Sequence, residues 1–374
     1  MDKKTVCKLL VLVAIPLLIS LFPAPAGLTK LAWVLSGIYL AAIVGLVIKP
    51  FSEPVILLVA VATSMVVIGN LGDGVIKSSS VLSGYASGTT WLVFSAFTLS
   101  AAFVITGLGK RIAYILIGKI GSTTLGLGYV TAFLDLILSP ATPSNTARAG
   151  GIVLPIINSV AVALGSEPEH TAKRVGHYLM INVYMVTKTT SYMFFTAMAG
   201  NILALKMIED ICHIKLSWGG WALAGILPGI IMLLLTPLIT YKLYPPELKK
   251  VDNKAIAKEG LESLGPMTLR EKMLSCLFVM ALAGWVFSKS LGVNESTVAI
   301  CVMALMLVLK IVTWDDVIKN KGGWNTLIWY GGIIGLSSLL SKVGFFLWLA
   351  ELLKDNISFG THSTLAFVVI VALS

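Results

Sequence analysis

Residues Ser139-Pro140-Ala141-Thr142-Pro143-Ser144-Asn145-Thr146 interrupt an otherwise apolar region, residues 124–164, and this interruption decides the fold. Proline lacks a backbone N–H and its ring clashes with the preceding helical turn, so the two prolines prevent one continuous helix. Backbone groups without helical hydrogen bonds are tolerated at membrane depth only where protein, water or a ligand satisfies them. The breakers and their apolar flanks predict a hairpin that enters and leaves a membrane on one side.

The composition around this stretch is that of a membrane protein with many spans. Of the 374 residues, 57% are hydrophobic and 12% are charged, against about a half and a quarter in soluble domains, which excludes a soluble fold. Apolar runs long enough to cross a bilayer, about 20 residues, recur between charged or Pro/Gly-rich breaks. We therefore expect an all-α polytopic membrane protein. The predicted spans are 7–23, 31–49, 54–70, 88–108, 178–204, 217–241, 272–290, 296–311 and 324–346.

The positions of the lysines and arginines test this topology. If the N-terminus is cytoplasmic and 124–164 does not cross, most basic residues lie inside, among them those of the large loop 242–272, as the positive-inside rule requires. A single crossing at 124–164 would move that loop outside. The net charge of +10 thus follows from topology, and we expect no nucleic-acid partner. We predict a multi-pass protein of the inner (cytoplasmic) membrane whose N-terminus is cytoplasmic.

Two apolar segments resemble each other and indicate an internal repeat. Trp91 opens the first, which leads to Gly109, and Trp324 opens the second, which leads to Gly344; the two glycines are 235 positions apart. In the predicted topology the segments cross in opposite directions, as an inverted repeat requires. The same offset places a partner of Ser144 at about position 379, past the last residue. We therefore expect an inverted-repeat transporter with re-entrant hairpins, whose C-terminal part is missing here.

The polar end of the interruption has the chemistry of a carboxylate receptor. Ser144, Asn145 and Thr146 offer hydroxyl and amide donors. A helix that restarts after Pro143 points its free N–H groups and the positive end of its dipole at the same place. Such a site binds an anion without a fixed cation and can release it, as transport requires. The alternative interpretation is a proline-kinked helix in which the Ser and Thr side chains only cap the break.

Two ionisable residues flank the interruption, Asp135 before it and Arg148 after it. The two arms of a hairpin bring them together, and ions inside a membrane normally pair. We favour a structural ion pair; the alternative is that Arg148 contacts the substrate or forms a gate. Lys188 in the next span can either pair with Asp135 or extend to the membrane surface.

That next span, residues 178–204, contains an unusual density of small polar residues. Its candidates for further substrate contacts are Thr190, Ser191 and Thr196. If the helix unwinds between Thr196 and Asn201, its donors and carbonyls lie opposite the hairpin tip, as in discontinuous transporter helices. The alternative is ordinary helix packing, which small residues also serve.

No residue cluster indicates catalysis or a resident metal. The four cysteines are scattered without a CxxC spacing, and the four histidines are isolated near span ends. No paired carboxylates, HExxH motif or Ser/His set lies at membrane depth. We predict no enzyme activity, no metal site and no cofactor, with Na+ left open as a coupling ion.

The motifs resemble a known family, the divalent anion/sodium symporters, and within it the 2-oxoglutarate/malate translocator (citrate/succinate antiporter) branch. The resemblance spans nearly the whole chain and is strongest from Ser139 to Arg148. The other matching stretches are Gly150–Pro155, Gly88–Trp91, Thr106–Arg111 and Thr196–Asn201. It implies a homodimer in which each protomer has a scaffold domain and a mobile transport domain that moves like an elevator. It also implies that Ser144-Asn145-Thr146 is the tip of the inward hairpin and contacts a substrate carboxylate.

The resemblance implies a function and a domain division. We expect exchange of C4–C5 dicarboxylates such as 2-oxoglutarate, malate and succinate across the inner membrane. Sodium-coupled members carry a hydroxyl where this chain has Pro140, which favours exchange over the alternative, a sodium-coupled dicarboxylate/citrate symporter; an anion channel is a third hypothesis. The expected domains are scaffold helices 1–120, a transport domain 121–241 with the hairpin 124–164, a cytoplasmic linker 242–271, scaffold helices 272–354 and the start of an outward hairpin 355–374.

Overall fold

The computed structural model describes residues 3–72, 74–212 and 214–356, and these form two compact units. Seven helices within them are long and apolar enough to cross a membrane, or up to eight if a bent pair is counted as one span. Within these ranges the regular structure is helical apart from an isolated bridge between Thr123 and Lys250. The predicted all-α polytopic membrane fold is confirmed. The predicted start of an outward hairpin, 355–374, lies outside the described residues except for its first two.

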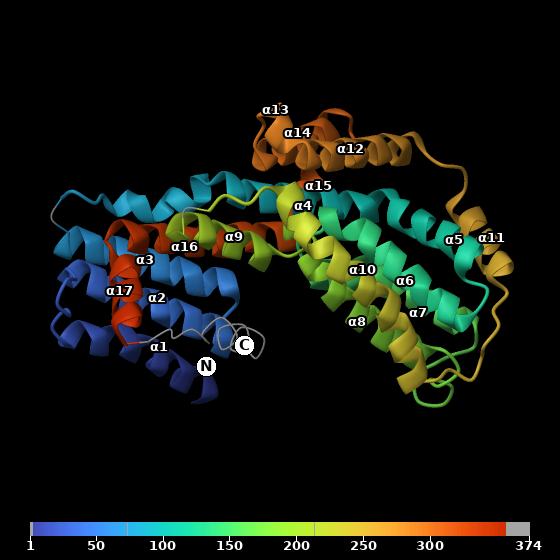
Figure 1. Ribbon diagram of the computed structural model, residues 1–374, viewed down its shortest axis with the longest axis horizontal. Helices are drawn as coiled ribbons and strands as arrows, with labels where there is room; N and C mark the ends of the chain where they lie inside the picture. Colours follow the sequence, from blue (N-terminus) through green and yellow to red (C-terminus); the bar gives the residue numbers. More distant parts are fainter. Residues whose placement is uncertain (1–2, 73, 213, 357–374) are drawn as a thin grey trace. The chain divides into compact units, whose positions relative to one another are not determined.

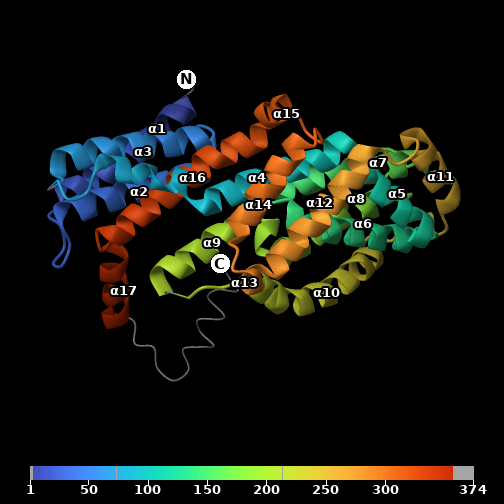
Figure 2. The same ribbon diagram turned by 90° about the horizontal axis from the view of Figure 1, so that it is seen from above.

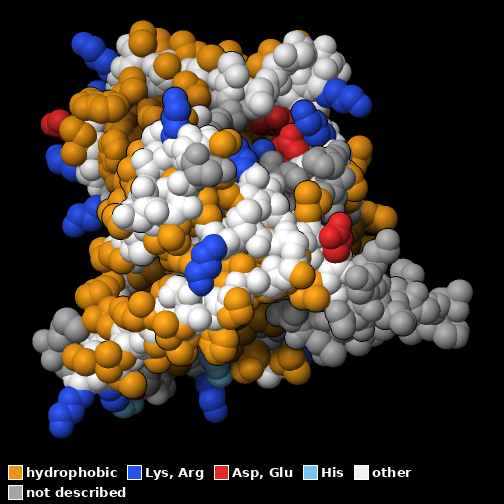
Figure 3. All heavy atoms as spheres, turned by 90° about the vertical axis from the view of Figure 1, so that its left-hand side faces the viewer, with side chains coloured by type: hydrophobic (Ala, Val, Ile, Leu, Met, Phe, Trp, Pro, Cys, Tyr) orange, Lys and Arg blue, Asp and Glu red, His pale blue; other side chains and the backbone are white. Residues whose placement is uncertain are grey.

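The first unit comprises the described residues up to Tyr85 and from Ile328 onward, together with the end of α9. Figures 1 and 2 show α1, α2 and α3 side by side. Helix α1 has no buried residue, and Leu10 and Leu21 are 65% and 79% exposed. Apolar side chains are spread widely over the face in Figure 3, as expected where the surrounding medium is lipid. The helices are α1 (Lys3–Leu21), α2 (Lys30–Ile48), α3 (Glu53–Leu71), the 3-10 segment η1 (Ser78–Ala86), α16 (Lys321–Lys342) from residue 328, and α17 (Phe345–Asn356).

Glycines allow η1 and α16 to touch backbone to backbone. A Cβ atom on Gly335 would lie 1.9 Å from the carbonyl oxygen of Val81, and one on Gly84 would lie 2.0 Å from that of Gly331. No side chain fits in either place. Small residues at such positions let membrane helices approach closely, which is a main source of their association energy.

Replacing Gly335 with alanine is therefore expected to lower the free energy of unfolding by about 1–3 kcal/mol, because overpacking forces the neighbouring backbone apart. Gly69→Ala is the matched control, since Gly69 is exposed on α3 and its Cβ would meet nothing within 4 Å. The control should be neutral or more stable by about 1 kcal/mol. Thermal unfolding in detergent measures both variants, and equal midpoints would contradict the close contact.

A helix, a left-handed glycine and a shorter amphipathic helix occur twice along the chain. In the second unit α4 (Gly88–Thr106) ends at Gly107, φ +79°, and is followed by α5 (Leu108–Ile120). In the first unit α16 is followed by Gly344, φ +78°, and α17 turns by 69°. These two matching breaks fall near the positions of the repeat that the sequence predicts, with the aligned glycines shifted by two residues.

The second unit, residues Ala86–Glu209 and Ile214–Leu327, contains the interrupted segment. It extends further than the predicted transport domain 121–241, because α5 packs against α6 and α11 and because α14 packs against α4. Besides α4 and α5, its elements are α6 (Thr124–Leu138), η2 (Ser139–Ala141), the π-helix η3 (Thr146–Val153), α7 (Leu154–Ala163), α8 (Gly176–Met193), η4 (Phe195–Ala197), α9 (Ala199–Cys212), α10 (Trp218–Leu243), α11 (Asn253–Leu264), α12 (Leu269–Val286), α13 (Ser288–Leu291), α14 (Glu295–Val308) and α15 (Trp314–Lys319).

The chain reverses at residues 142–145, so α6 and α7 form the arms of a hairpin. The N–H of Thr124, at the start of the first arm, donates to the carbonyl of Lys249 at 3.1 Å. Beyond the second arm, the carbonyl of Lys173 accepts from the N–H of Glu247 at 3.2 Å. Both ends of the hairpin thus lie beside the segment 247–250, at one end of the second unit.

Two tyrosines attach the long helix α10 to this hairpin and to α8. Pro237 inside α10 removes one helical donor. Near it, the hydroxyl of Tyr178 donates to the carbonyl of Pro237 at 3.2 Å, and that of Tyr129 donates to the carbonyl of Leu234 at 2.9 Å. These bonds join α6 and the start of α8 to the same part of α10.

One sequence-based prediction needs correction. The span 178–204 is not continuous, because the helix breaks at residues 194–198 between α8 and α9. The segment 242–271, predicted as a linker, contains α11, which packs on α5. The Asn253 side-chain amide donates to the carbonyls of Ile117 and Gly118, both at 2.9 Å, and the buried pair of Arg111 with Glu271 (2.6 Å) fixes the end of the linker.

Candidate functional site

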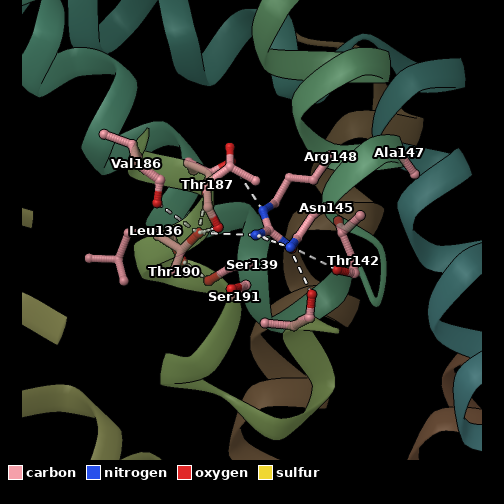
Figure 4. Close-up of polar contacts among 12 residues, drawn as sticks. Leu136, Ser139, Thr142, Asn145, Ala147, Arg148, Val186, Thr187, Thr190 and Ser191 are labelled. Carbon is pink, nitrogen blue, oxygen red and sulfur yellow. Dashed lines mark hydrogen bonds and ion pairs between the residues drawn. The ribbon is translucent and has the colours of Figure 1, made fainter. Parts of the chain in front are cut away.

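The guanidinium of Arg148 lies at the centre of the hairpin tip (Figure 4). Its Nε donates to Asp135 Oδ1 at 3.0 Å, and neither side chain is exposed at all. The two residues come from the two arms, so the ion pair joins them just below the turn. Loss of either partner of such a buried pair strongly destabilises the folded protein, because the other charge is left buried and unpaired. The interpretation of Asp135 and Arg148 as an ion pair agrees with this geometry.

The remaining Arg148 donors are also satisfied, and they join three segments. Nη1 donates to the carbonyls of Thr142 (3.0 Å) and Ala197 (3.1 Å). Nη2 donates to Asn145 Oδ1 (3.2 Å) and Thr190 Oγ1 (3.0 Å). The guanidinium therefore connects the hairpin tip with α8 and with the 3-10 turn η4. These partners form an all-oxygen shell closed by the carboxylate of Asp135.

The unwound segment between α8 and α9 lies directly against the tip. The N–H of Ala199 donates to the carbonyl of Pro143 at 2.9 Å. The side-chain amide of Asn201 donates back to the carbonyls of Ser191 (2.6 Å) and Phe194 (3.2 Å), which satisfies groups that the broken helix leaves unpaired. The sequence left open whether this region unwinds or packs as a plain helix, and the structure shows that it unwinds.

The polar side chains at the hairpin tip differ in how far they are exposed to solvent. The hydroxyl of Ser144 accepts from the N–H of Ala147 at 3.2 Å and caps the new helix. Ser144 and Asn145 are half-buried, and Thr146 is exposed. The helix that follows is a π-helix, η3, in which the exposed Gly150 and Gly151 face open space. Accessible hydroxyl and amide groups at the positive end of a helix make an anion receptor.

The structure does not bring all of the predicted site residues to one place. Thr190 is fully buried in the Arg148 network, where it also donates to Asp135. The hydroxyl of Thr196 is buried and accepts from Trp218 Nε1 at 3.0 Å, and that of Ser191 donates to the carbonyl of Lys188 at 2.6 Å. Ser191 is half-buried like Ser144 and Asn145, but its hydroxyl bonds within its own helix. The accessible predicted residues of the hairpin tip are Ser144, Asn145 and Thr146.

Of the two roles considered for Lys188, the structure does not show the pair with Asp135. Asp135 is engaged by Arg148, and the Lys188 ammonium lies 5.1 Å from the ring centroid of Tyr184 on the exposed side of α8. Sequence reasoning also missed the carbonyls of Thr142 and Ala197, since backbone acceptors leave no mark on the sequence. Trp218 was missed because the residue that it contacts, Thr196, is far from it in the sequence.

The described residues contain no group of three His, Cys, Asp or Glu side chains placed to hold a metal. One buried polar atom at the tip, the hydroxyl of Thr142, has no hydrogen-bond partner among them. Buried hydroxyls are normally paired, so this one is open to a water molecule. The site thus places neutral donors beside a fixed, internally neutralised cation, an arrangement that can accept an anion.

Comparisons with known proteins identify relatives of this chain, two of them named as transporters of small dicarboxylates. The inner membrane protein YbhI of Escherichia coli (strain K12) is 76% identical over 374 residues, 100% of this chain and 78% of that protein. The putative malate transporter YflS of Bacillus subtilis (strain 168) is 40% identical over 363 residues, 96% of this chain and 74% of that protein. The L-tartrate/succinate antiporter of Escherichia coli (strain K12) is 36% identical over 379 residues, 96% of this chain and 76% of that protein.

The family described as the sodium:sulfate symporter transmembrane region matches residues 3–374. Its members are transporters, and the resemblance stated from the sequence is confirmed. The chain is a multi-span protein of the inner membrane and belongs to the divalent anion:sodium symporter family.

Proposed function

We propose that this protein exchanges small C4–C5 dicarboxylates across the inner membrane and that the hairpin tip binds one substrate carboxylate. The names of two relatives, a putative malate transporter and an L-tartrate/succinate antiporter, support the substrate class. Malate, tartrate and succinate are all C4 dianions at neutral pH. A hairpin tip that offers neutral donors suits such anions.

At the tip, Ser144, Asn145 and Thr146 are the substrate contacts in this proposal. Their side chains are accessible at the hairpin tip, and the N-terminal end of η3 and α7 adds the positive end of a helix dipole. Thr190 and Thr196 support the site from behind, since their hydroxyls hold Arg148 and Trp218 in place. Ser191 contributes its carbonyl to the bond with Asn201.

The observation that favours exchange over sodium symport is the position of Arg148. Its guanidinium occupies a shell of five oxygens that includes the Asp135 carboxylate and two backbone carbonyls. Unwound carbonyls beside a re-entrant tip are the groups that coordinate Na+ in sodium-driven transporters. Here a permanent cation, already neutralised by Asp135, holds that place. Pro140, where sodium-coupled members carry a hydroxyl, also favours exchange over sodium symport.

The proposal extends to the movement and the topology. The hairpin 124–164 enters and leaves from the cytoplasmic side, and the N-terminus is cytoplasmic. The domain that contains the hairpin moves against a scaffold within a homodimer. Since both hairpin ends lie beside residues 247–250, the basic segment 242–271 marks the cytoplasmic end of the moving domain.

Counterflow in proteoliposomes tests this function. Labelled succinate uptake should rise about tenfold or more when the vesicles contain unlabelled malate, and an inward sodium gradient should change it by less than about twofold. The description of the family names sodium, so symport is the second candidate. Uptake into empty vesicles driven by sodium would show symport, and non-saturating uptake without internal substrate would show a channel.

A further inference from the structure

A polar cavity lies within the second unit, and none of the Arg148 partners lines it. Its volume is about 690 Å³, and it is lined by the starts of α4, α10 and α14 and by one face of α9. Small-molecule sites commonly occupy about 300–1,000 Å³, so a C4 dianion fits with room for water. The charged residues of its lining are Lys206, Lys215, Lys289, Glu209 and Glu295.

The charges of this lining leave an excess of positive charge. One carboxylate, that of Glu209, lies 3.5 Å from the ammonium groups of both Lys206 and Lys215. Glu295 is already engaged, because its Oε1 accepts from Ser288 Oγ (3.1 Å) and from the N–H of Trp218 (3.4 Å). In the part of the chain that the structure describes, no carboxylate lies within ion-pair distance of the exposed Lys289. Among the described residues of the lining, Lys289 thus adds a positive charge that neither Glu209 nor Glu295 neutralises.

The helix ends around the cavity add to its positive electrostatic potential. Ser87, Ser217 and Asn294 are the N-caps of α4, α10 and α14, so three positive dipole ends meet here. The starts of α4 and α14 touch, since a Cβ atom on Gly88 would lie 3.1 Å from Ser296 Oγ. A cleft in which positive charge exceeds negative charge raises the local concentration of anions.

We infer that this cavity, the lysine vestibule, is a second binding site for small dianions, separate from the hairpin tip. Lys215 and Lys289 are its exposed cations. It adjoins the tip through η4, because Phe195 lines the vestibule while the carbonyl of Ala197 contacts Arg148. The vestibule captures dicarboxylate weakly and so raises the rate at which the anion reaches the tip. The ligand class, though not the site, rests on the proposed function.

The experiment measures binding of ¹³C-labelled succinate by ligand-observed NMR, with the full chain in phosphatidylcholine nanodiscs, so that no anionic headgroup competes. Asn145→Ala removes the tip site, and the binding that remains reports on the vestibule. Adding Lys215→Gln and Lys289→Gln to that variant should weaken the remaining binding by about fivefold or more. About 0.5 M NaCl should weaken it similarly. Lys77→Gln with Lys272→Gln removes two exposed lysines elsewhere and should leave it unchanged.

Three outcomes would overturn the vestibule. They are loss of all succinate binding in Asn145→Ala, no effect of the Lys215 and Lys289 changes, and equal weakening by the Lys77 and Lys272 control. Thermal unfolding should not change, because all four lysines are exposed. The proposed function fails separately, if Asn145→Ala still exchanges dicarboxylates in proteoliposomes. In wild-type background the Lys215 and Lys289 changes should raise the KM for external substrate and leave the maximal exchange rate unchanged.

Discussion

Asp135→Ala is expected to lower the free energy of unfolding by about 3–5 kcal/mol, because it leaves the charge of Arg148 buried without a counter-ion. Both side chains are completely buried, and Asp135 also accepts from Thr187 and Thr190. The four neutral acceptors around the guanidinium cannot replace a carboxylate. The purified variant should unfold at a much lower temperature in detergent than the wild-type protein.

The matched control is Glu262→Ala, which removes the carboxylate of an exposed pair with Lys258 (3.9 Å). Exposed pairs contribute about 0–1 kcal/mol, so this variant should be nearly as stable as the wild type. Asp135→Asn is informative as well, because it keeps the shape and one acceptor while it removes the charge. If Asp135→Ala and Glu262→Ala unfold at the same temperature, the ion pair does not stabilise the hairpin.

Asn145→Ala is expected to reduce dicarboxylate exchange by about 100-fold or more, because a positioned donor is lost at the substrate and Arg148 loses one acceptor. Asn145 is half-buried, so the fold should lose only about 1 kcal/mol. Counterflow with labelled succinate measures the exchange. Thermal unfolding of the same preparation shows that the protein is folded.

The variant Asn145→Asp distinguishes an effect on substrate binding from an effect on the stability of the fold. The new carboxylate would lie at hydrogen-bond distance from the guanidinium of Arg148, which should keep the fold at least as stable as in the wild type. Exchange should nevertheless be lost, because the substrate meets a like charge. Asn70→Ala, at an exposed amide near the end of α3, is the control for loss of an amide. Near-normal exchange by either Asn145 variant would disprove the site.

Local chemistry made the hairpin and its ion pair predictable. Two prolines in an apolar segment permit few structures, and a reversal between Asp135 and Arg148 brings the two charges to the same depth. The break at Thr196–Asn201 was foreseen only as one of two alternatives. The structure decides between them through the bonds of Ala199 to Pro143 and of Asn201 to Phe194, which link residues that sequence patterns do not connect.

Other features depend on tertiary contacts that the sequence does not display. Helix α11 is polar overall, so the sequence of residues 242–271 resembles that of a loop. The helix is held by tertiary contacts, in which Gly260 packs against the ring of Tyr114 and Asn253 bonds to the end of α5. The boundary between the two compact units, after Tyr85, likewise depends on tertiary contacts. Helix α14 has only 14 residues, fewer than the predicted span 296–311, because Asn294 caps its start and the chain turns at Lys310, φ +52°.

The π-helix after the tip limits how this segment can evolve. Its last turn is closed by the N–H of Leu154 and the carbonyl of Ala149, five residues apart, whereas an α-helix needs only four. Deleting one residue would restore α-helical geometry and turn the tip by about 100° relative to α7, so that Arg148 no longer met Asp135. Between Asn145 and Pro155 an insertion or deletion of one residue would therefore disconnect the tip from its supporting charge, even where a substitution at the exposed Gly150 or Gly151 is tolerated.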